Sequence, residues 1–113
     1  MNHKTVEQYV LSVPNAKLDY PFGEDVAVYK VNDKMFALIA EKSDPARISL
    51  KCDPKLAKVL REKYETVMAG YHLNKKHWNT IVLSGQLGEE DIIGLIRHSY
   101  DLVAKNQSDT PEF

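Results

Sequence analysis

The segment with the most chemically useful side chains in this chain is Gly70-Tyr71-His72-Leu73-Asn74-Lys75-Lys76-His77-Trp78-Asn79-Thr80. It places two lysines, two histidines, a tyrosine and a tryptophan within one short stretch. Lysines can neutralise phosphates while an indole ring stacks on a base, so the segment suits a nucleic-acid surface. It equally suits an ordinary sheet edge, where lysines protect an exposed strand and a tryptophan behind them caps the core. The residue types alone leave both interpretations open.

Charge is distributed unevenly along the chain, although its formal net charge is only −1. Residues 51–80 hold seven basic and three acidic residues, whereas residues 84–113 hold two basic and six acidic residues. A nearly neutral protein can bind a polyanion only through such local asymmetry. The basic stretch therefore favours a phosphate-facing surface, but the same charges also fit helices that are simply well solvated.

The remaining polar residues form no recognisable catalytic or metal-binding pattern. His72 and His77, taken with Cys52 or His98, match no usual zinc-ligand spacing, so we expect no metal and no cofactor. A helix start after Cys52 could lower its pKa, but the neighbouring charge of Asp53 opposes that shift, and a small buried cysteine is the better interpretation. The sequence contains no phosphate-binding glycine loop and no nucleophile-base motif, which predicts a non-enzymatic protein without catalytic residues.

A length of 113 residues is typical of one domain that buries a core without disulfides. The single cysteine has no internal partner, and the sequence shows neither a signal-like segment nor a long apolar run. These features predict a protein of the reducing cytoplasm with no membrane partner. We expect one domain over residues 1–106 and a disordered polar tail over residues 107–113.

Hydrophobic periodicity and turn residues predict the elements that position the basic-aromatic segment. A Thr5–Gln8 capping box begins the first helix, Asp53-Pro54 begins the second, and Asn32-Asp33 suits a tight hairpin turn. The expected order is helix 5–13, strands 16–20, 26–31, 35–41 and 47–51, helix 54–64, strands 66–71 and 78–83, and helix 89–105. This order predicts a two-layer α+β domain, in which helices cover one face of a mainly antiparallel sheet.

The same patterning predicts which side chains face the core. In segment 47–51, alternation places Ile48 and Leu50 inside and leaves Arg47, Ser49 and Lys51 on the open face. Helical spacing predicts that Val59 of the second helix is buried. One shared core is expected to contain Leu60, Leu50, Phe36, Leu38, Ile81, Ile92 and Ile96.

Several segments together resemble the MmcQ/YjbR-like family, over nearly the whole chain and in register. The resemblance rests on Pro21-Phe22-Gly23, Lys34-Met35-Phe36-Ala37, Ile48-Ser49-Leu50-Lys51-Cys52-Asp53-Pro54, the segment from Gly70 to Thr80, and Ser99-Tyr100-Asp101-Leu102-Val103. It implies a compact α+β fold similar to the frataxin-like and type III secretion chaperone-like folds. It also implies DNA binding through a proposed double-wing arrangement. Two departures are Ala69, where relatives tend to have proline, and Asp33, where they tend to have glycine.

The resemblance and the charge pattern together give a candidate DNA-binding site. Lysines would contact phosphates, and Trp78 would either pack under the loop or stack on an unpaired base. Since no element has the features of a sequence-specific recognition helix, binding is expected to be weak and sequence-independent. The alternative is a protein-interaction or chaperone-like module that docks a partner on an exposed sheet face containing Arg47, Ser49, Lys51 and Thr80. The candidate DNA contacts are Lys75, Lys76, His77, Trp78, Lys51, Arg47 and Lys34.

Overall fold

The computed structural model describes the backbone of residues 1–109 and the side chains of residues 1–105. It contains one six-stranded antiparallel sheet of order β1-β2-β3-β4-β6-β5. The predicted α+β class and element order are confirmed. The elements are α1 (His3–Leu11), β1 (Lys17–Asp19), β2 (Val26–Val31), β3 (Lys34–Ala40), β4 (Arg47–Lys51), α2 (Pro54–Lys63), β5 (Val67–Ala69), β6 (Trp78–Val82) and α3 (Glu89–Asp109).

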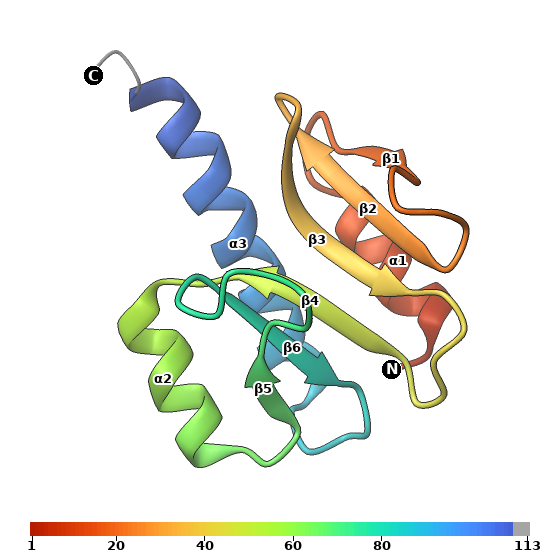
Figure 1. Cartoon of the computed structure of the whole chain (residues 1–113), viewed down its shortest axis with the longest axis vertical. Coiled ribbons are helices and arrows are strands. Elements are labelled where there is room, and N and C mark those ends of the chain that lie inside the picture. Colours follow the sequence, from red (N-terminus) through yellow and green to blue (C-terminus); the bar gives the residue numbers. More distant parts are fainter. Residues whose placement is uncertain (110–113) are drawn as a thin grey trace.

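All three helices cover the same face of the sheet, which gives two layers (Figure 1). α3 packs on β2, β3 and β4, α1 packs on β3 and α3, and α2 packs on β5 and β6. Asn79 of β6 donates from Nδ2 to the Ala57 carbonyl of α2 at 3.3 Å, and Ile81, two residues along the same strand, faces the main core. Within the described part of the chain, no helix covers the opposite face, and none is long and apolar enough to cross a bilayer.

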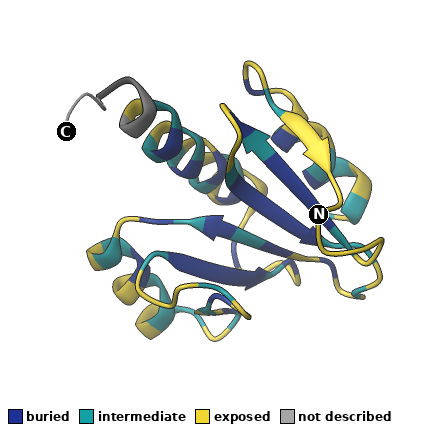
Figure 2. Cartoon of the chain, turned by 45° about the horizontal axis from the view of Figure 1, so that its top comes forward, coloured by how far each residue is buried: buried dark blue, intermediate teal, exposed yellow. Residues whose placement is uncertain are grey.

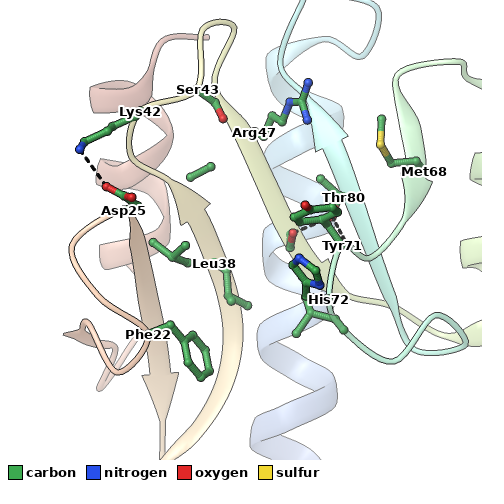
Figure 3. Close-up of a pocket in the computed structure, with 14 residues that line it drawn as sticks. Phe22, Asp25, Leu38, Lys42, Ser43, Arg47, Met68, Tyr71, His72 and Thr80 are labelled. Atoms are coloured by element: carbon green, nitrogen blue, oxygen red, sulfur yellow. Dashed lines mark hydrogen bonds and ion pairs between the residues drawn. The ribbon is translucent and has the colours of Figure 1, made fainter.

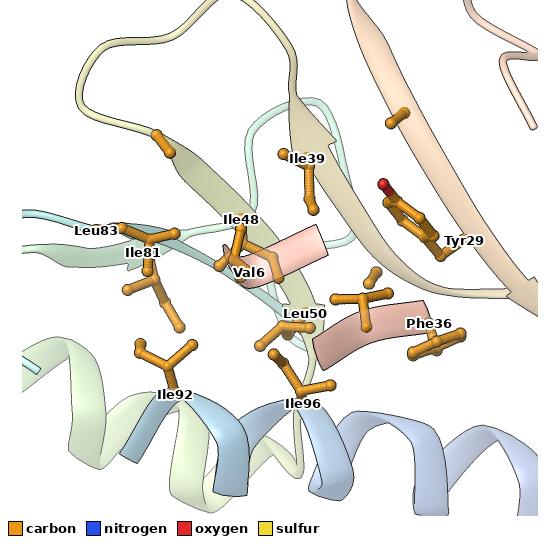
Figure 4. Close-up of a cluster of buried hydrophobic side chains, with 14 of the residues drawn as sticks. Val6, Tyr29, Phe36, Ile39, Ile48, Leu50, Ile81, Leu83, Ile92 and Ile96 are labelled. Atoms are coloured by element: carbon orange, nitrogen blue, oxygen red, sulfur yellow. The ribbon is translucent and has the colours of Figure 1, made fainter. Parts of the chain in front are cut away.

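The main core lies between the sheet and the helices (Figure 4). Burial is concentrated in β2, β3, β4 and β6, whereas β1 at the sheet edge is exposed (Figure 2). The prediction of one shared core is wrong for Leu38, which joins Val28 and Trp78 in a second cluster on the open face. The other predicted members lie in or against the main core, namely Phe36, Leu50, Ile81, Ile92, Ile96 and the partly buried Leu60.

A β-bulge at Phe36 allows consecutive residues of β3 to face the main core. The β2–β3 register passes from Tyr29↔Ala37 to Lys30↔Met35, so Phe36 has no partner on β2. Both Phe36 and Ala37 therefore belong to the main core, although strand residues normally alternate between faces.

Ser99 of α3 fastens this irregular end of β3 to β4, where the regular ladder stops at Ala37↔Leu50. Its side chain is fully buried. The Ser99 hydroxyl accepts the Lys51 N–H at 2.9 Å and donates to the Phe36 carbonyl. One helix side chain thus satisfies two backbone groups that the strands leave unpaired.

Helix boundaries differ from the prediction at both ends of the chain. α1 begins two residues earlier than expected because Asn2 caps it, with Asn2 Oδ1 accepting the Thr5 N–H at 2.8 Å, so the Thr5 capping box is wrong. α3 continues to Asp109, past the predicted start of the tail at residue 107. The rest of the predicted disordered tail, residues 110–113, lies outside the described residues.

In the middle of the chain the predicted starts and turns are confirmed. Asp53 caps α2 by accepting backbone N–H bonds from Lys55 and Leu56. Asn32 and Asp33 have φ values of 52° and 65°, as a tight hairpin turn requires. Val59 was predicted to be buried, but it is 54% exposed.

Candidate functional site

A groove of about 540 Å³ lies on the open face of the sheet, between two turns that are far apart in the sequence. One wall is Phe22, from the turn between β1 and β2. The other wall is formed by Tyr71, His72 and Leu73, from the loop between β5 and β6. Figure 3 shows Phe22 on one side and Tyr71 and His72 on the other, with Leu38 of β3 between them. Phe22 is 63% exposed and Tyr71 is 72% exposed, so both rings stand available at the rim.

The floor of the groove follows from strand alternation. Residues two apart on one strand share a face, and neighbouring strands stack these residues side by side. The floor includes part of the second hydrophobic cluster, because Leu38 lines the groove and packs with Trp78 in that cluster. The floor residues are Val26 of β2, Leu38 and Ala40 of β3, Arg47 and Ser49 of β4, Met68 of β5, and Thr80 of β6.

Two hydroxyl groups in the floor hold the loop wall in place. Ser49 and Thr80 are register partners on β4 and β6, and their hydroxyl oxygens are 2.7 Å apart. Thr80 Oγ1 also accepts the Tyr71 N–H at 3.2 Å, which joins the loop to the sheet. Thr80 was predicted to be exposed, but it is only 4% exposed because these neighbours cover it.

The charged residues of the groove leave one cation without a partner. Lys42 Nζ lies 3.0 Å from Asp25 Oδ1, so this pair is internally neutralised. Arg47 is exposed, and among the described residues no carboxylate lies within ion-pair distance of its guanidinium. This part of the groove therefore carries a net positive charge.

The basic loop that follows the groove wall is tied down by backbone contacts. Arg61 of α2 donates from Nη2 to the Lys75 carbonyl at 2.5 Å, and Lys75 Nζ donates to the Gly70 carbonyl at 3.3 Å. Asn74 Oδ1 accepts the Lys76 N–H at 2.9 Å. Lys75 and Lys76 are exposed and His77 is half-buried, so the loop displays its cations on a fixed backbone.

The Trp78 ring is not accessible for stacking on a base. It is 7% exposed and packs with Val28, Leu38 and Leu73. Of the two predicted roles, packing under the loop is therefore confirmed, whereas stacking needs an exposed ring and is contradicted by this burial. A Cβ on Gly70 would lie 2.7 Å from the Trp78 Cβ, which explains why the chain needs glycine there.

The other predicted DNA contacts are divided between places on the sheet. Arg47 pairs with Val82 and lines the groove, whereas Lys51, at the far end of β4, pairs with Trp78. Lys51 thus lies at the end of the sheet where the basic loop returns to β6. Lys34 is exposed at the β2–β3 hairpin and is not part of the groove lining.

Cys52 is buried in the fold, and His98 forms a hydrogen bond with the backbone at the start of α2. Cys52 is 3% exposed, as the buried-cysteine prediction requires, and burial together with the Asp53 charge raises its pKa to about 11. His98 Nε2 accepts the Asp53 N–H at 3.1 Å. In the part of the chain that the structure describes, no three histidine, cysteine, aspartate or glutamate residues lie close enough together to hold a metal ion.

The sequence did not single out Phe22, Leu38 or Tyr71 as a site. Pro21-Phe22-Gly23 and the segment beginning at Gly70 are both recognisable as turns that carry an exposed aromatic residue. The missing information was the strand order, which places these two turns on either side of β3, β4 and β6.

The region of this chain that is similar to known proteins contains the whole groove. A family model named YjbR matches residues 11–102, a range that contains every groove residue. Escherichia coli O157:H7 YbdF, named as an uncharacterised protein, is 34% identical over 101 residues, which cover 89% of this chain and 83% of YbdF. YjbR of Escherichia coli strain K12, also named as uncharacterised, is 36% identical over 93 residues, which cover 82% of this chain and 79% of that protein.

Solved structures give the same relationship in three dimensions. A crystal structure of a Deinococcus radiodurans protein is similar with a TM-score of 0.89 at 35% identity, covering 94% of this chain and 80% of that one. A crystal structure of a Pseudomonas syringae protein is similar with a TM-score of 0.79 at 35% identity, covering 91% of this chain and 99% of that one. The similarity therefore extends over the sheet that carries the groove and the helices that support this sheet.

Proposed function

This chain belongs to the YjbR family, and we propose that it is a non-enzymatic binding protein that holds a small molecule in the groove of its open sheet face. The observation that carries the proposal is a groove of about 540 Å³ with exposed aromatic rings on its two walls. Small-molecule sites commonly have volumes of about 300 to 1,000 Å³ and combine an apolar lining with a few polar groups. The floor and walls of this groove have that composition.

Binding is favoured over catalysis by the state of the groove hydroxyls. A nucleophilic hydroxyl needs a base within hydrogen-bond distance to activate it. Ser49 and Thr80 bond to each other, and no hydroxyl among the described groove residues forms a hydrogen bond with a histidine or carboxylate side chain. The arrangement supports recognition of a ligand without its chemical conversion.

A small molecule is favoured over a protein partner by the extent of the apolar surface. A stable protein interface usually buries about 800 Å² on each partner. The large, exposed apolar side chains of the groove are Phe22, Met68 and Tyr71, which surround one compact depression rather than a broad face. Protein docking on this sheet face remains the competing interpretation that the test below addresses.

The chain contains its own optical reporter for groove occupancy. Trp78 is the single tryptophan, and it packs against Leu38 and Leu73, which both line the groove. We expect 8-anilinonaphthalene-1-sulfonate, an apolar aromatic anion, to bind the native protein saturably at one site and to change the Trp78 fluorescence. Tyr71→Ala and Phe22→Ala should each weaken binding by roughly fivefold to thirtyfold, since each removes about 1 to 2 kcal/mol of buried apolar contact.

Val59→Ala is the matched control, because Val59 is 54% exposed on α2 and is not part of the groove lining. This variant should bind the dye as the wild-type protein does. Absence of saturable dye binding, or equal weakening by the control, would contradict the groove as a binding site. Far-UV circular dichroism of each variant shows whether it is folded, so that weaker dye binding is not mistaken for unfolding.

A second function that we propose is weak, sequence-independent DNA binding by the basic loop. It is supported by the exposed Lys75 and Lys76 and by Lys51 at the adjoining end of β4. If these lysines neutralise phosphates, the logarithm of affinity should fall by about 0.9 per contacted phosphate for each decade of salt. Joint substitution of Lys75 and Lys76 by alanine should flatten that slope by up to about two units. Joint substitution of Lys55 and Lys58, exposed lysines of α2, should change it much less.

We also propose a cytoplasmic location, which is supported by the single free thiol of the described chain. Cys52 is unpaired and buried, and reducing compartments keep such thiols in this state. Cell fractionation with an antibody against the folded protein tests this location, and recovery outside the cytoplasm would contradict it.

A further inference from the structure

We infer that the groove recognises a small amphipathic carboxylic acid, whose carboxylate pairs with Arg47 and whose apolar body lies between Phe22 and Tyr71. This inference deepens the proposed binding function and rests on it. It starts from the distribution of charge and apolar surface inside one groove.

The charge of the groove calls for an anion. Asp25 and Lys42 form an ion pair at 3.0 Å and cancel each other. Arg47 has no carboxylate within ion-pair distance among the residues described. A guanidinium presents paired N–H donors that match both oxygens of a carboxylate, so a ligand carboxylate would supply the partner that the protein lacks.

A second donor can assist Arg47 from the same strand face. Ser49 is two residues from Arg47 on β4, so both side chains lie on the groove side of the sheet. Thr80 Oγ1 already accepts the Tyr71 N–H. When the Thr80 hydroxyl donates to Ser49, the Ser49 proton is free to reach a ligand oxygen. Arg47 and Ser49 then form a donor pair along one side of the floor.

The anion is better matched by a carboxylate than by a phosphate. Phosphate sites usually combine several backbone N–H groups at a helix N-terminus or in a glycine-rich nest. The groove is built from strand faces and the three loops β1–β2, β3–β4 and β5–β6, and no helix residue is among the lining residues. A single free guanidinium with one hydroxyl suits a singly charged planar acid.

The apolar body of the ligand is defined by the remaining lining. Val26, Leu38, Ala40 and Leu73 supply aliphatic surface beside Arg47 and Ser49. Phe22 and Tyr71 stand exposed on opposite walls, so a ring or short chain between them would cover aromatic surface that is now in water (Figure 3). An acid with one ring and a short linker therefore satisfies both parts of the groove.

A matched pair of probes tests this inference by nuclear magnetic resonance titration of the folded protein. The probes are 3-phenylpropionate and its neutral amide, 3-phenylpropionamide, which differ only in the charged group. We expect both to shift the backbone amides of Ser49 and Tyr71, with the acid binding about tenfold more tightly. Arg47→Gln should reduce this ratio to near one. Arg97→Gln, which changes an exposed arginine of α3, should leave the ratio unchanged.

The outcomes separate this inference from the proposed function. Equal binding of acid and amide, or retention of the preference in Arg47→Gln, overturns the carboxylate inference. If the dye binds the groove but neither probe does, the inference is likewise overturned and the groove still stands as a binding site. If neither the dye nor the probes bind, the proposed function itself fails. Stronger binding of a neutral extended peptide, acetylated and amidated at its ends, than of the acid would overturn the inference in favour of protein docking.

Discussion

Replacement of Ser99 by alanine tests how α3 holds the bulged end of β3 to β4. The Ser99 hydroxyl is buried and bonds to the Lys51 N–H at 2.9 Å and to the Phe36 carbonyl. Ser99→Ala leaves one backbone donor and one acceptor without partners in a dry environment. Each such group costs about 1 to 3 kcal/mol, and relaxation of the strands recovers part of the sum, so we expect a loss of about 2 to 4 kcal/mol.

Urea unfolding followed by circular dichroism measures this free energy. Ser84→Ala is the matched control, since Ser84 is exposed in the loop before α3, and it should change stability by less than about 0.5 kcal/mol. Hydrogen exchange of the Lys51 amide provides a local readout, because this amide should be protected in the wild-type protein and exchange much faster in Ser99→Ala. A loss below about 0.5 kcal/mol together with unchanged Lys51 protection would refute the bridging role.

Two further predictions concern the loop wall and the thiol. Gly70→Ala should destabilise the protein by roughly 1 to 3 kcal/mol in the same urea assay, because the new Cβ would lie 2.7 Å from the Trp78 Cβ. Gly94→Ala on α3 is the control: its Cβ meets nothing within 4 Å, so this substitution should be neutral or stabilising. Equal effects of the two substitutions would contradict the close packing at Gly70. The Cys52 thiol should react slowly with Ellman's reagent at pH 8 and rapidly after unfolding, because burial raises its pKa to about 11. Fast reaction of the native protein at pH 8 would contradict this burial. The stabilising contribution of the neutral buried thiol should be complete below its ordinary pKa of 9.0 and should decline as the pH rises toward 11.

The arrangement of the groove has a consequence for how ligand binding and loop order are linked. The β5–β6 loop is held by the Tyr71 N–H bond to Thr80 on the groove side and by Arg61 on the α2 side. The groove wall and the basic loop are therefore parts of one segment, separated only by Asn74. A molecule that binds against Tyr71 and Leu73 would act on the same backbone that displays Lys75 and Lys76.

The sequence by itself determined the local structure of this protein. Strand alternation in residues 47–51 placed Ile48 and Leu50 in the core and Arg47 and Ser49 on the open face, because period-two patterning is a local property of an extended backbone. The Asp53 cap and the Asn32-Asp33 turn were equally local, since each depends on hydrogen bonds or φ values of adjacent residues. Asn2 was missed because Thr5, the other possible cap near the chain start, forms a capping-box pattern with Gln8.

The tertiary structure decided which of these elements meet. Leu38 faces the open side of the sheet, whereas the consecutive residues Phe36 and Ala37 both face the main core. The bulge at Phe36 causes this break in alternation, which the sequence pattern could not predict. Trp78 is buried because it packs with Val28 and Leu38 of other strands and with Leu73 of the loop. The groove exists only because antiparallel pairing brings β2, β3, β4 and β6 side by side. This pairing sets Phe22 and Tyr71, which are distant in sequence, on opposite walls, an arrangement that no local propensity encodes.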